Sequence, residues 1–230
     1  MTPLQKKPVL NEIIVERGGL KLDVYKNTYE TFQELKKIAK NVIETNQKTI
    51  SKKDNRIVFD YSDNGEFETQ LKFGGDMLLM NMHTNVFQFP REHPIMNLSY
   101  IKKEPSRSYC GIINMYNFLA DSIRYNRIND IGYLVARIFI NVDYHFFVEG
   151  KRQIGLMYNN FSRSVIDQNS LKKILNTAMT YCVEFDLLTP NYDSVKVVSV
   201  SEIQENSMSQ SMRTGKRLGF RFQVDKDDSE

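Results

Sequence analysis

The sequence has 230 residues, of which 41% are hydrophobic and 26% are charged, and its formal net charge is +3. These ordinary globular proportions exclude a chain that is disordered throughout, and so small a net charge does not by itself indicate binding to nucleic acid. No apolar run approaches the ~20 residues that a membrane-spanning helix needs. The N-terminus leads into Pro8 and a charged segment instead of an apolar signal core. We therefore expect a cytoplasmic protein that does not associate with a membrane.

The first part of the chain predicts a hairpin followed by a helix. Residues 13–24 hold two short apolar stretches around Gly18-Gly19, and glycine tolerates the backbone of a tight turn. Residues 29–43 then carry apolar side chains at three-to-four spacing, which predicts an amphipathic helix capped by Asn27 and Glu30. One face of this helix must be buried.

Three strands are predicted next, at residues 56–61, 66–73 and 77–89, with turns between them. The second strand alternates apolar and polar side chains, as expected of a strand with one face buried. We expect the preceding helix to pack on the apolar face of this meander through Phe32, Leu35, Ile38 and Val42.

The rest of the chain continues the mixture of strands and helices. An irregular, proline-containing segment at 90–108 is a candidate linker or functional loop. A strong helix is predicted at 171–185. The other predictions are strands at 111–116, 135–148, 153–158, 195–200 and 218–224 and a short helix at 117–125.

Helices therefore interrupt antiparallel hairpins instead of alternating with single strands. We predict an α+β fold with a mostly antiparallel β-sheet, two main amphipathic helices and one short helix. Residues 1–224 would form a single domain, and residues 225–230 a disordered acidic tail.

Common catalytic and cofactor-binding motifs are missing from the sequence. The few glycines make neither a dinucleotide fingerprint nor a phosphate-binding loop. There is likewise no zinc-protease helix, no Cys-x-x-Cys pair and no nucleophile elbow. Cys110 and Cys182 are the only cysteines, and we expect both to be reduced, buried and inert. No cofactor and no metal are expected.

The best-defined candidate site consists of polar side chains on two predicted strands. On each of two predicted strands they recur at every second position and so share one face. The residues are Asn81, His83 and Asn85 on the first strand, and Arg137, Asn141, Asp143 and His145 on the second. If the strands are neighbours, the two stripes could line one polar groove, in which Asp143 orients His145 for acid–base chemistry. The alternative is that both stripes are the solvated face of an antiparallel sheet, which is the commoner arrangement.

A basic segment near the C-terminus is a second candidate site. It contains Arg213, Lys216, Arg217 and Arg221, and Phe220 and Phe222 interleave with it. Cations and aromatic rings together can bind phosphates and stack bases. Strand alternation, however, puts the Phe side chains and Arg221 on opposite faces, so a buried Phe face and solvated Arg side chains are the commoner outcome.

Three functions follow, in order of preference. The first is a non-enzymatic, cytoplasmic binding or regulatory protein, sensor-like, whose partner is an unknown small molecule or protein, and which can also form a homo-oligomer. The second is a nucleic-acid-associated protein that uses the basic C-terminal strand and the loop at 102–107. The third is an enzyme that uses His83, Asp143 and His145 in a polar groove. A steep salt dependence of binding would favour the second, and convergence of the stripes in a cleft the third.

Overall fold

The computed structural model describes residues 9–209 except 129, 152, 158, 187, 188 and 190, and within this range it leaves out the side chains of 194 and 205–209. It begins with helix α1, Leu10–Lys53, whose 44 residues span about 66 Å at 1.5 Å per residue. The helix predicted at 29–43 is confirmed as the middle of α1. The hairpin prediction at 13–24 is wrong, because Gly18 and Gly19 lie inside this helix. The predicted cap at Asn27 and Glu30 is wrong as well, because both residues lie in the interior of α1.

Seven strands form one antiparallel sheet. In the order β1-β2-β3-β5-β6-β7 each strand pairs with the next, and β4 pairs with β5. The strands are β1 Phe59–Asp63, β2 Glu68–Phe73, β3 Asp76–Met82, β4 Phe87–Gln88, β5 Tyr109–Leu119, β6 Tyr133–Asn141 and β7 Phe146–Gly150. The predicted meander and the α+β class are confirmed.

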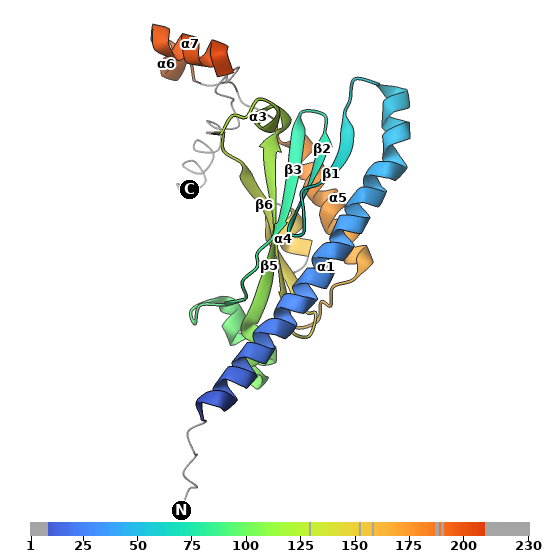
Figure 1. The fold of residues 1–230 in the computed structure, drawn as a ribbon, viewed down its shortest axis with the longest axis vertical. Coiled ribbons are helices and arrows are strands. Elements are labelled where there is room, and N and C mark those ends of the chain that lie inside the picture. The colour runs from blue at the N-terminus through green and yellow to red at the C-terminus, as the bar shows by residue number, and fades with distance from the viewer. Residues whose placement is uncertain are drawn as a thin grey trace, which may run out of the picture.

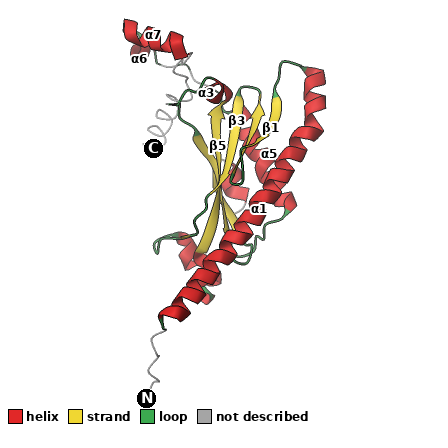
Figure 2. Ribbon diagram, in the orientation of Figure 1, coloured by secondary structure: helices red, strands yellow, loops and turns green. Residues whose placement is uncertain are grey.

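Helices α1 and α5 (Gln168–Glu184) cover one face of the sheet, which we call the helix face (Figures 1 and 2). The main core lies between them and the sheet, and it includes Phe32, Leu35, Leu71, Ile138 and Ile174. The predicted helix at 171–185 and the packing of the earlier helix on the meander are therefore confirmed. In each strand, the side chains at the alternate positions point to the other face of the sheet, which we call the open face.

Two contacts fix α1 against the sheet. A Cβ atom on Gly111 in β5 would overlap the Thr28 side chain, so only glycine allows the helix and strand to come this close. Further along, Lys36 donates to the Asp63 carboxylate at 2.6 Å and to the Gly65 carbonyl at 2.9 Å. The Lys36 side chain is only 9% exposed, and both partners are needed to compensate its burial.

Two predicted strands are interrupted. The strand predicted at 77–89 ends at Met82, and only β4 continues it after a break. The strand predicted at 135–148 is a hairpin, because β6 ends at Asn141 and β7 starts at Phe146. The turn between them holds Tyr144 at a φ of 59°, a left-handed conformation that no regular strand contains.

The short helices account for the remaining differences. The prediction of a short helix at 117–125 is confirmed by α3 (Ala120–Arg124). The strand predicted at 153–158 is wrong, because α4 (Gln153–Met157) packs its Ile154 against Gly150. The segment 90–108 contains two short 3-10 helices, η1 (Pro94–Asn97) and η2 (Pro105–Ser108), and α2 (Ser99–Lys103).

The strand predicted at 195–200 is also wrong, because α6 (Tyr192–Val195) and α7 (Val200–Ser209) occupy this region. Ser199 and Glu202 form a reciprocal cap: Glu202 N–H donates to the Ser199 hydroxyl at 3.1 Å, and Ser199 N–H donates to the Glu202 carboxylate at 2.9 Å. This capping box starts α7 and outweighs the β-branched composition before it. The strand predicted at 218–224 and the tail at 225–230 lie outside the described residues.

Candidate functional site

The structure brings the two predicted polar stripes together only in part, and it separates their histidines. His83 follows β3 and His145 precedes β7, and strands β5 and β6 lie between them. Three strand spacings separate such positions by about 14 Å. His83 and Asn85 instead form a local turn, in which the Asn85 N–H donates to His83 Nδ1 at 3.0 Å. The His83 ring packs edge-on against Phe87 at 4.7 Å.

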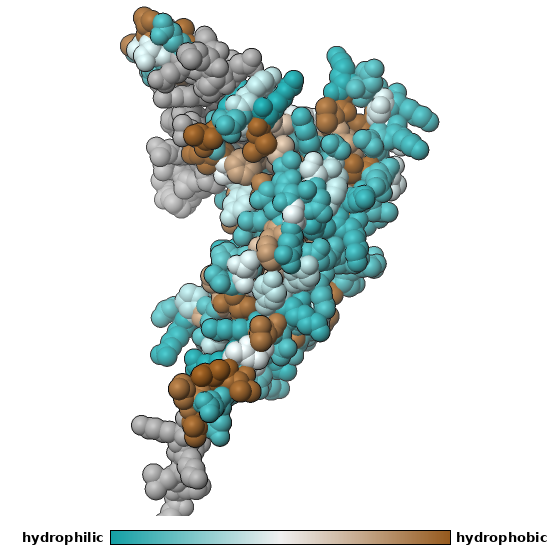
Figure 3. Space-filling model, viewed as in Figure 1, coloured by the Kyte–Doolittle hydropathy of each residue, from teal (hydrophilic) through white to brown (hydrophobic). Residues whose placement is uncertain are grey.

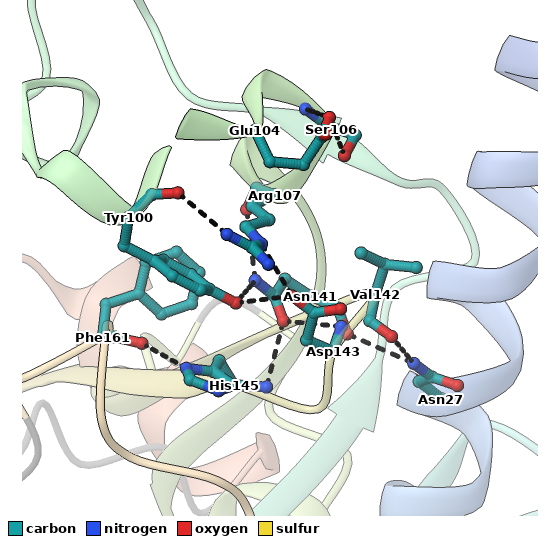
Figure 4. Close-up of polar contacts among 10 residues, drawn as sticks. All are labelled: Asn27, Tyr100, Glu104, Ser106, Arg107, Asn141, Val142, Asp143, His145 and Phe161. Carbon is teal, nitrogen blue, oxygen red and sulfur yellow. Dashed lines mark hydrogen bonds and ion pairs between the residues drawn. The ribbon is translucent and has the colours of Figure 1, made fainter. Parts of the chain in front are cut away.

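Asn141, Asp143 and His145 belong to the β6–β7 turn, which their own polar groups stabilise (Figure 4). The fully buried Asn141 side chain accepts hydrogen bonds at 3.0 Å from both the Asp143 N–H and the His145 N–H. Asparagine often stabilises a turn in this way, by replacing a backbone acceptor. From α1, Asn27 donates to the Val142 carbonyl at 2.7 Å, so the helix holds the same turn.

The segment 99–108 is attached to this turn by Tyr100 and Arg107. The Tyr100 hydroxyl and the Arg107 Nε both donate to one oxygen of Asp143, at 2.9 and 2.8 Å. The Arg107 guanidinium lies 4.4 Å from the centre of the Tyr100 ring, and the same ring stacks with His145 at 4.7 Å. We call Tyr100, Arg107, Asn141, Asp143 and His145 the turn cluster.

The groups of the turn cluster that could transfer protons are already engaged. Burial, with the hydrogen bond to Asp143, raises the pKa of Tyr100 to about 12, and the hydrogen bond from Asn141 opposes this rise only in part. His145 Nδ1 lies 2.9 Å from the Phe161 carbonyl oxygen. Asp143 is paired with Arg107. The turn cluster therefore attaches the segment 99–108 to the β6–β7 turn.

A second set of polar residues crosses the open face in the middle of the sheet. Strand register places Asn81, Asn114, Arg137 and Glu149 side by side on four successive strands. The adjacent row, in the same way, holds Leu79, Tyr116 and Leu134. All seven are half-buried. We call these seven residues the open band.

Apolar side chains cover part of the open face on both sides of the band. At the end near the β6–β7 turn, Ile112, Phe139 and Phe147 are buried under residues that include Ile95 and Phe161. At the opposite end the Phe118 ring lies against the backbone of Gly132, where an added Cβ would overlap the ring. The open band is thus a strip between two covered ends.

Charge within the open band is balanced. Arg137 donates through Nε to Glu149 at 3.0 Å and through its Nη2 group to the same carboxylate oxygen. His93, from the segment 90–108, places its Nε2 3.8 Å from the other oxygen of Glu149. The Asn81 amide oxygen is buried and accepts no hydrogen bond from the described part of the chain. The band therefore presents amide groups beside a neutralised ion pair.

Sequence reasoning found part of each group. Asn81 and Arg137 were predicted site residues and lie in the open band, and Asn141, Asp143 and His145 lie in the turn cluster. Tyr100, Asn114 and Glu149 were not predicted, and Arg107 was predicted only as part of the loop at 102–107 in the nucleic-acid alternative. Alternation within the predicted strand 111–116 would have placed Asn114 on the open face, whereas Tyr100 gave no sequence signal.

Other candidate sites are weaker. Within the described ranges no three His, Cys, Asp or Glu side chains are grouped to hold a metal ion. The predicted burial of Cys110 and Cys182 is confirmed, and burial raises the pKa of the Cys110 thiol. A pocket between the sheet and α5, lined by Asn117, Leu134 and Phe185 among others, admits about one water molecule.

The basic residues Arg213, Lys216, Arg217 and Arg221 lie outside the described residues. The helices of the described part are all too short or too polar to cross a membrane.

Fold and site together define an α+β protein whose antiparallel sheet has helices on one face and a polar band on the other. Comparison with protein-family models, curated protein sequences and solved structures found no match for the chain.

Proposed function

We propose that this is a non-enzymatic binding protein that holds a small polar ligand on the open band. The observation that carries the proposal is the row of hydrogen-bonding side chains across four strands, half exposed between two closed ends. The Asn81 amide oxygen in this row is buried and has no partner among the described residues. A buried acceptor left unpaired costs about 1–3 kcal/mol.

The chemistry of the band indicates the class of ligand. Asn81 and Asn114 each offer an amide donor and an acceptor. Arg137 is neutralised by Glu149, so the band favours an uncharged molecule over an anion. The adjacent row of Leu79, Tyr116 and Leu134 suits an apolar surface. A flat heterocycle or carboxamide, with donors and acceptors along one edge, fits this combination.

The two alternative functions have less support. For nucleic acid, Arg107 of the loop at 102–107 is already paired with Asp143. For an enzyme, His83 follows β3 and His145 precedes β7, with β5 and β6 between them, and Asp143 is held by Arg107 and Tyr100 instead of orienting His145. A binding function requires neither arrangement.

A screen with uncharged heterocycles and amides, such as nicotinamide, adenosine and uridine, tests the proposal. A ligand present at about 100 times its Kd should raise the free energy of unfolding by about 2.7 kcal/mol. Asn114→Leu and Arg137→Met should each abolish this increase. Asn85→Ala, in the exposed turn after β3, is the matched control and should retain it. Absence of binding by every probe, or binding that survives both band substitutions, would contradict the proposal.

A further inference from the structure

Strand β1 forms an edge of the sheet, and within the described part of the chain it pairs on one side only, with β2. At the opposite edge the outer side of β7 is partly used, because the Phe146 N–H donates to the Ser164 carbonyl at 2.9 Å. Ile57 and Val58, just before β1, are each 45% exposed. Figure 3 shows apolar surface between the end of α1 and β1. An edge strand of this kind is a template for a further strand.

The backbone directions in β1 follow from two hydrogen bonds beside it. The Val58 carbonyl accepts from the Gly74 N–H at 2.8 Å, and the Asn64 N–H donates to the Glu68 carbonyl at 3.2 Å. The even-numbered residues of β1 therefore direct their N–H and C=O groups to β2, and the odd-numbered residues direct theirs outward. The outward groups belong to Phe59, Tyr61 and Asp63. No hydrogen bond from the described residues reaches these groups.

The side chains of β1 specify what kind of strand could be added. Phe59 and Tyr61 are half-buried against the main core, on the helix face. Asp60 points to the open face, is exposed, and takes part in no ion pair within the described ranges. A matching strand carries apolar side chains at alternate positions and a cation between them.

Residues 218–224, which lie outside the described residues, have this pattern in the sequence. Their apolar side chains occupy every second position, with one cation, Arg221, among the others. The apolar residues are Leu218, Phe220, Phe222 and Val224. We propose that residues 218–224 pair with β1 of the same chain, in antiparallel orientation, as a further strand of the sheet.

The ion pair between Arg221 and Asp60 sets the register. These two residues become a directly opposed pair without mutual backbone hydrogen bonds, in which side chains lie closest. The same register gives the outward backbone groups of β1 their partners and continues the apolar layer of the helix face. It places Phe220 beside Tyr61, Phe222 beside Phe59 and Leu218 beside Asp63.

Charge at the ends of the segment favours the antiparallel orientation. In this orientation Asp225 lies beside Arg56, whose side chain is 86% exposed. A parallel strand with the same ion pair would instead place Arg217 beside Arg56, and like charges directly opposite each other are destabilising.

The chain is long enough for the segment to reach β1. Phe185, at the end of α5, has its ring 5.7 Å from that of Tyr133 at the start of β6. Four strand spacings, about 19 Å, separate β6 from β1. Residues 186–217 connect α5 to the segment, and the part outside α6 and α7 can alone span about 60 Å when extended.

Amide hydrogen exchange of the full chain, followed by NMR, tests the pairing. The outward N–H groups of Phe59 and Tyr61 should exchange about 100-fold more slowly in the wild type than in Phe220→Glu/Phe222→Glu. The amides of Asp60 and Ser62, which face β2, should be protected in both proteins and show that the variant is folded. Arg221→Glu should also reduce the protection, and Asp60→Lys/Arg221→Glu should recover it.

A disulfide tests the register. Asp60→Cys/Arg221→Cys should form an intramolecular disulfide on mild oxidation, since opposed residues of this kind lie within disulfide distance. Lys72→Cys/Arg221→Cys is the matched control and should not, because Lys72 lies opposite Asp60 on β2, one strand further away. Cys110 and Cys182 are buried and will not interfere.

Rapid exchange at both outward amides of the wild type would overturn the proposal. So would protection that Phe220→Glu/Phe222→Glu leaves unchanged, which would mean that something else covers β1. A disulfide that links two chains would assign the segment to β1 of a second copy, against pairing within one chain.

Discussion

The two faces of the sheet differ in what covers them and in what their residues can therefore do. On the helix face, α1 and α5 bury a continuous apolar layer, in which Leu35, Leu71 and Ile138 have no exposed surface. On the open face, apolar residues are buried only at the two ends, and the band between them stays half exposed. The helix face accounts for most of the stability, and this frees the side chains of the band for binding.

The largest expected effect compares the same substitution on the two faces. Leu35→Ala should lower the free energy of unfolding by about 2–5 kcal/mol, because it leaves a cavity in the main core. Leu79→Ala, in the half-exposed band, should lower it by no more than about 1 kcal/mol. Urea denaturation measures both values. Equal losses would mean that the two faces are buried alike.

The next effect tests how tightly α1 is seated on the helix face. Gly111→Ala should destabilise the protein by about 1–3 kcal/mol, since the new methyl group would overlap the Thr28 side chain. Removing that side chain by Thr28→Gly in the same protein should recover part of the loss in the same denaturation experiment. Gly75→Ala, which meets nothing within 4 Å, is the control. A neutral Gly111→Ala would show that α1 can move away from β5.

A substitution of Asp167 tests the stability of α5, the second helix of the helix face. The Asp167 carboxylate accepts a hydrogen bond from the Ser170 N–H at 2.7 Å and so caps α5. Asp167→Ala should cost about 1 kcal/mol. Hydrogen bonds from Ser170 hold the pKa of Asp167 below its ordinary 3.8. The carboxylate therefore stabilises the fold above pH 3.8, and this contribution is lost as the pH falls through the lower native pKa.

The pH dependence of unfolding, measured for the wild type and for Asp167→Asn, checks this prediction. The asparagine keeps a capping oxygen but cannot titrate. The two proteins should differ in the slope of stability against pH only in the acidic range. A difference that persists unchanged below about pH 3 would be inconsistent with the assignment.

A substitution of Tyr100 tests the covered end of the open face, near the β6–β7 turn. Tyr100→Phe should cost about 0.5–1.5 kcal/mol, as expected for a lost hydrogen bond. The native pKa of about 12 exceeds the ordinary 10.0, so the contribution of the hydroxyl is complete below pH 10 and is lost as the pH rises through 12. The difference in tyrosinate absorbance between wild type and Tyr100→Phe should therefore appear near pH 12. Its appearance near pH 10 would show an unburied hydroxyl.

The smallest effect is expected in the open band. Asn114→Leu should change the free energy of unfolding by no more than about 0.5 kcal/mol, because the side chain is half exposed and lies in the band between the two covered ends. Paired with the ligand screen, this variant separates binding from stability. A loss as large as that of Leu35→Ala would place Asn114 among the structural residues.

The elements with the strongest apolar period were predictable from the sequence. The middle of α1, the helix at 171–185 and the three strands of the meander each bury one face, and that burial imposes the period of 3.6 or 2 on the residues. Residues 20–24 mislead because Leu20, Leu22 and Val24 alternate, although Leu22 is 69% exposed on a helix. Here the continuation of a long helix outweighs a short alternation.

The candidate site was less predictable for two physical reasons. The β6–β7 turn contains no glycine or proline, so Asn141, Asp143 and His145 resembled one face of a longer strand. Asn141 followed by Asp143 is the available signal, since the Asn side chain can bond the backbone two residues on. Neighbouring strands could not be assigned either, because alternation fixes the face of Asn81 and Arg137 but not the strands beside them.

The order of the strands along the sheet has a consequence for how the protein folds. Each long strand pairs with the next long strand in the chain, but the connections differ in length: the turns between β1, β2 and β3 are short, whereas residues 83–108 separate β3 from β5. During synthesis, α1 leaves the ribosome before the strands of the sheet, so Phe32 and Leu35 have no surface on which to pack until strands have paired. The hairpins can meanwhile add one by one in the order of translation. Because α1 packs against β5 as well as against the meander, its apolar face stays partly exposed until β5 has paired with β3.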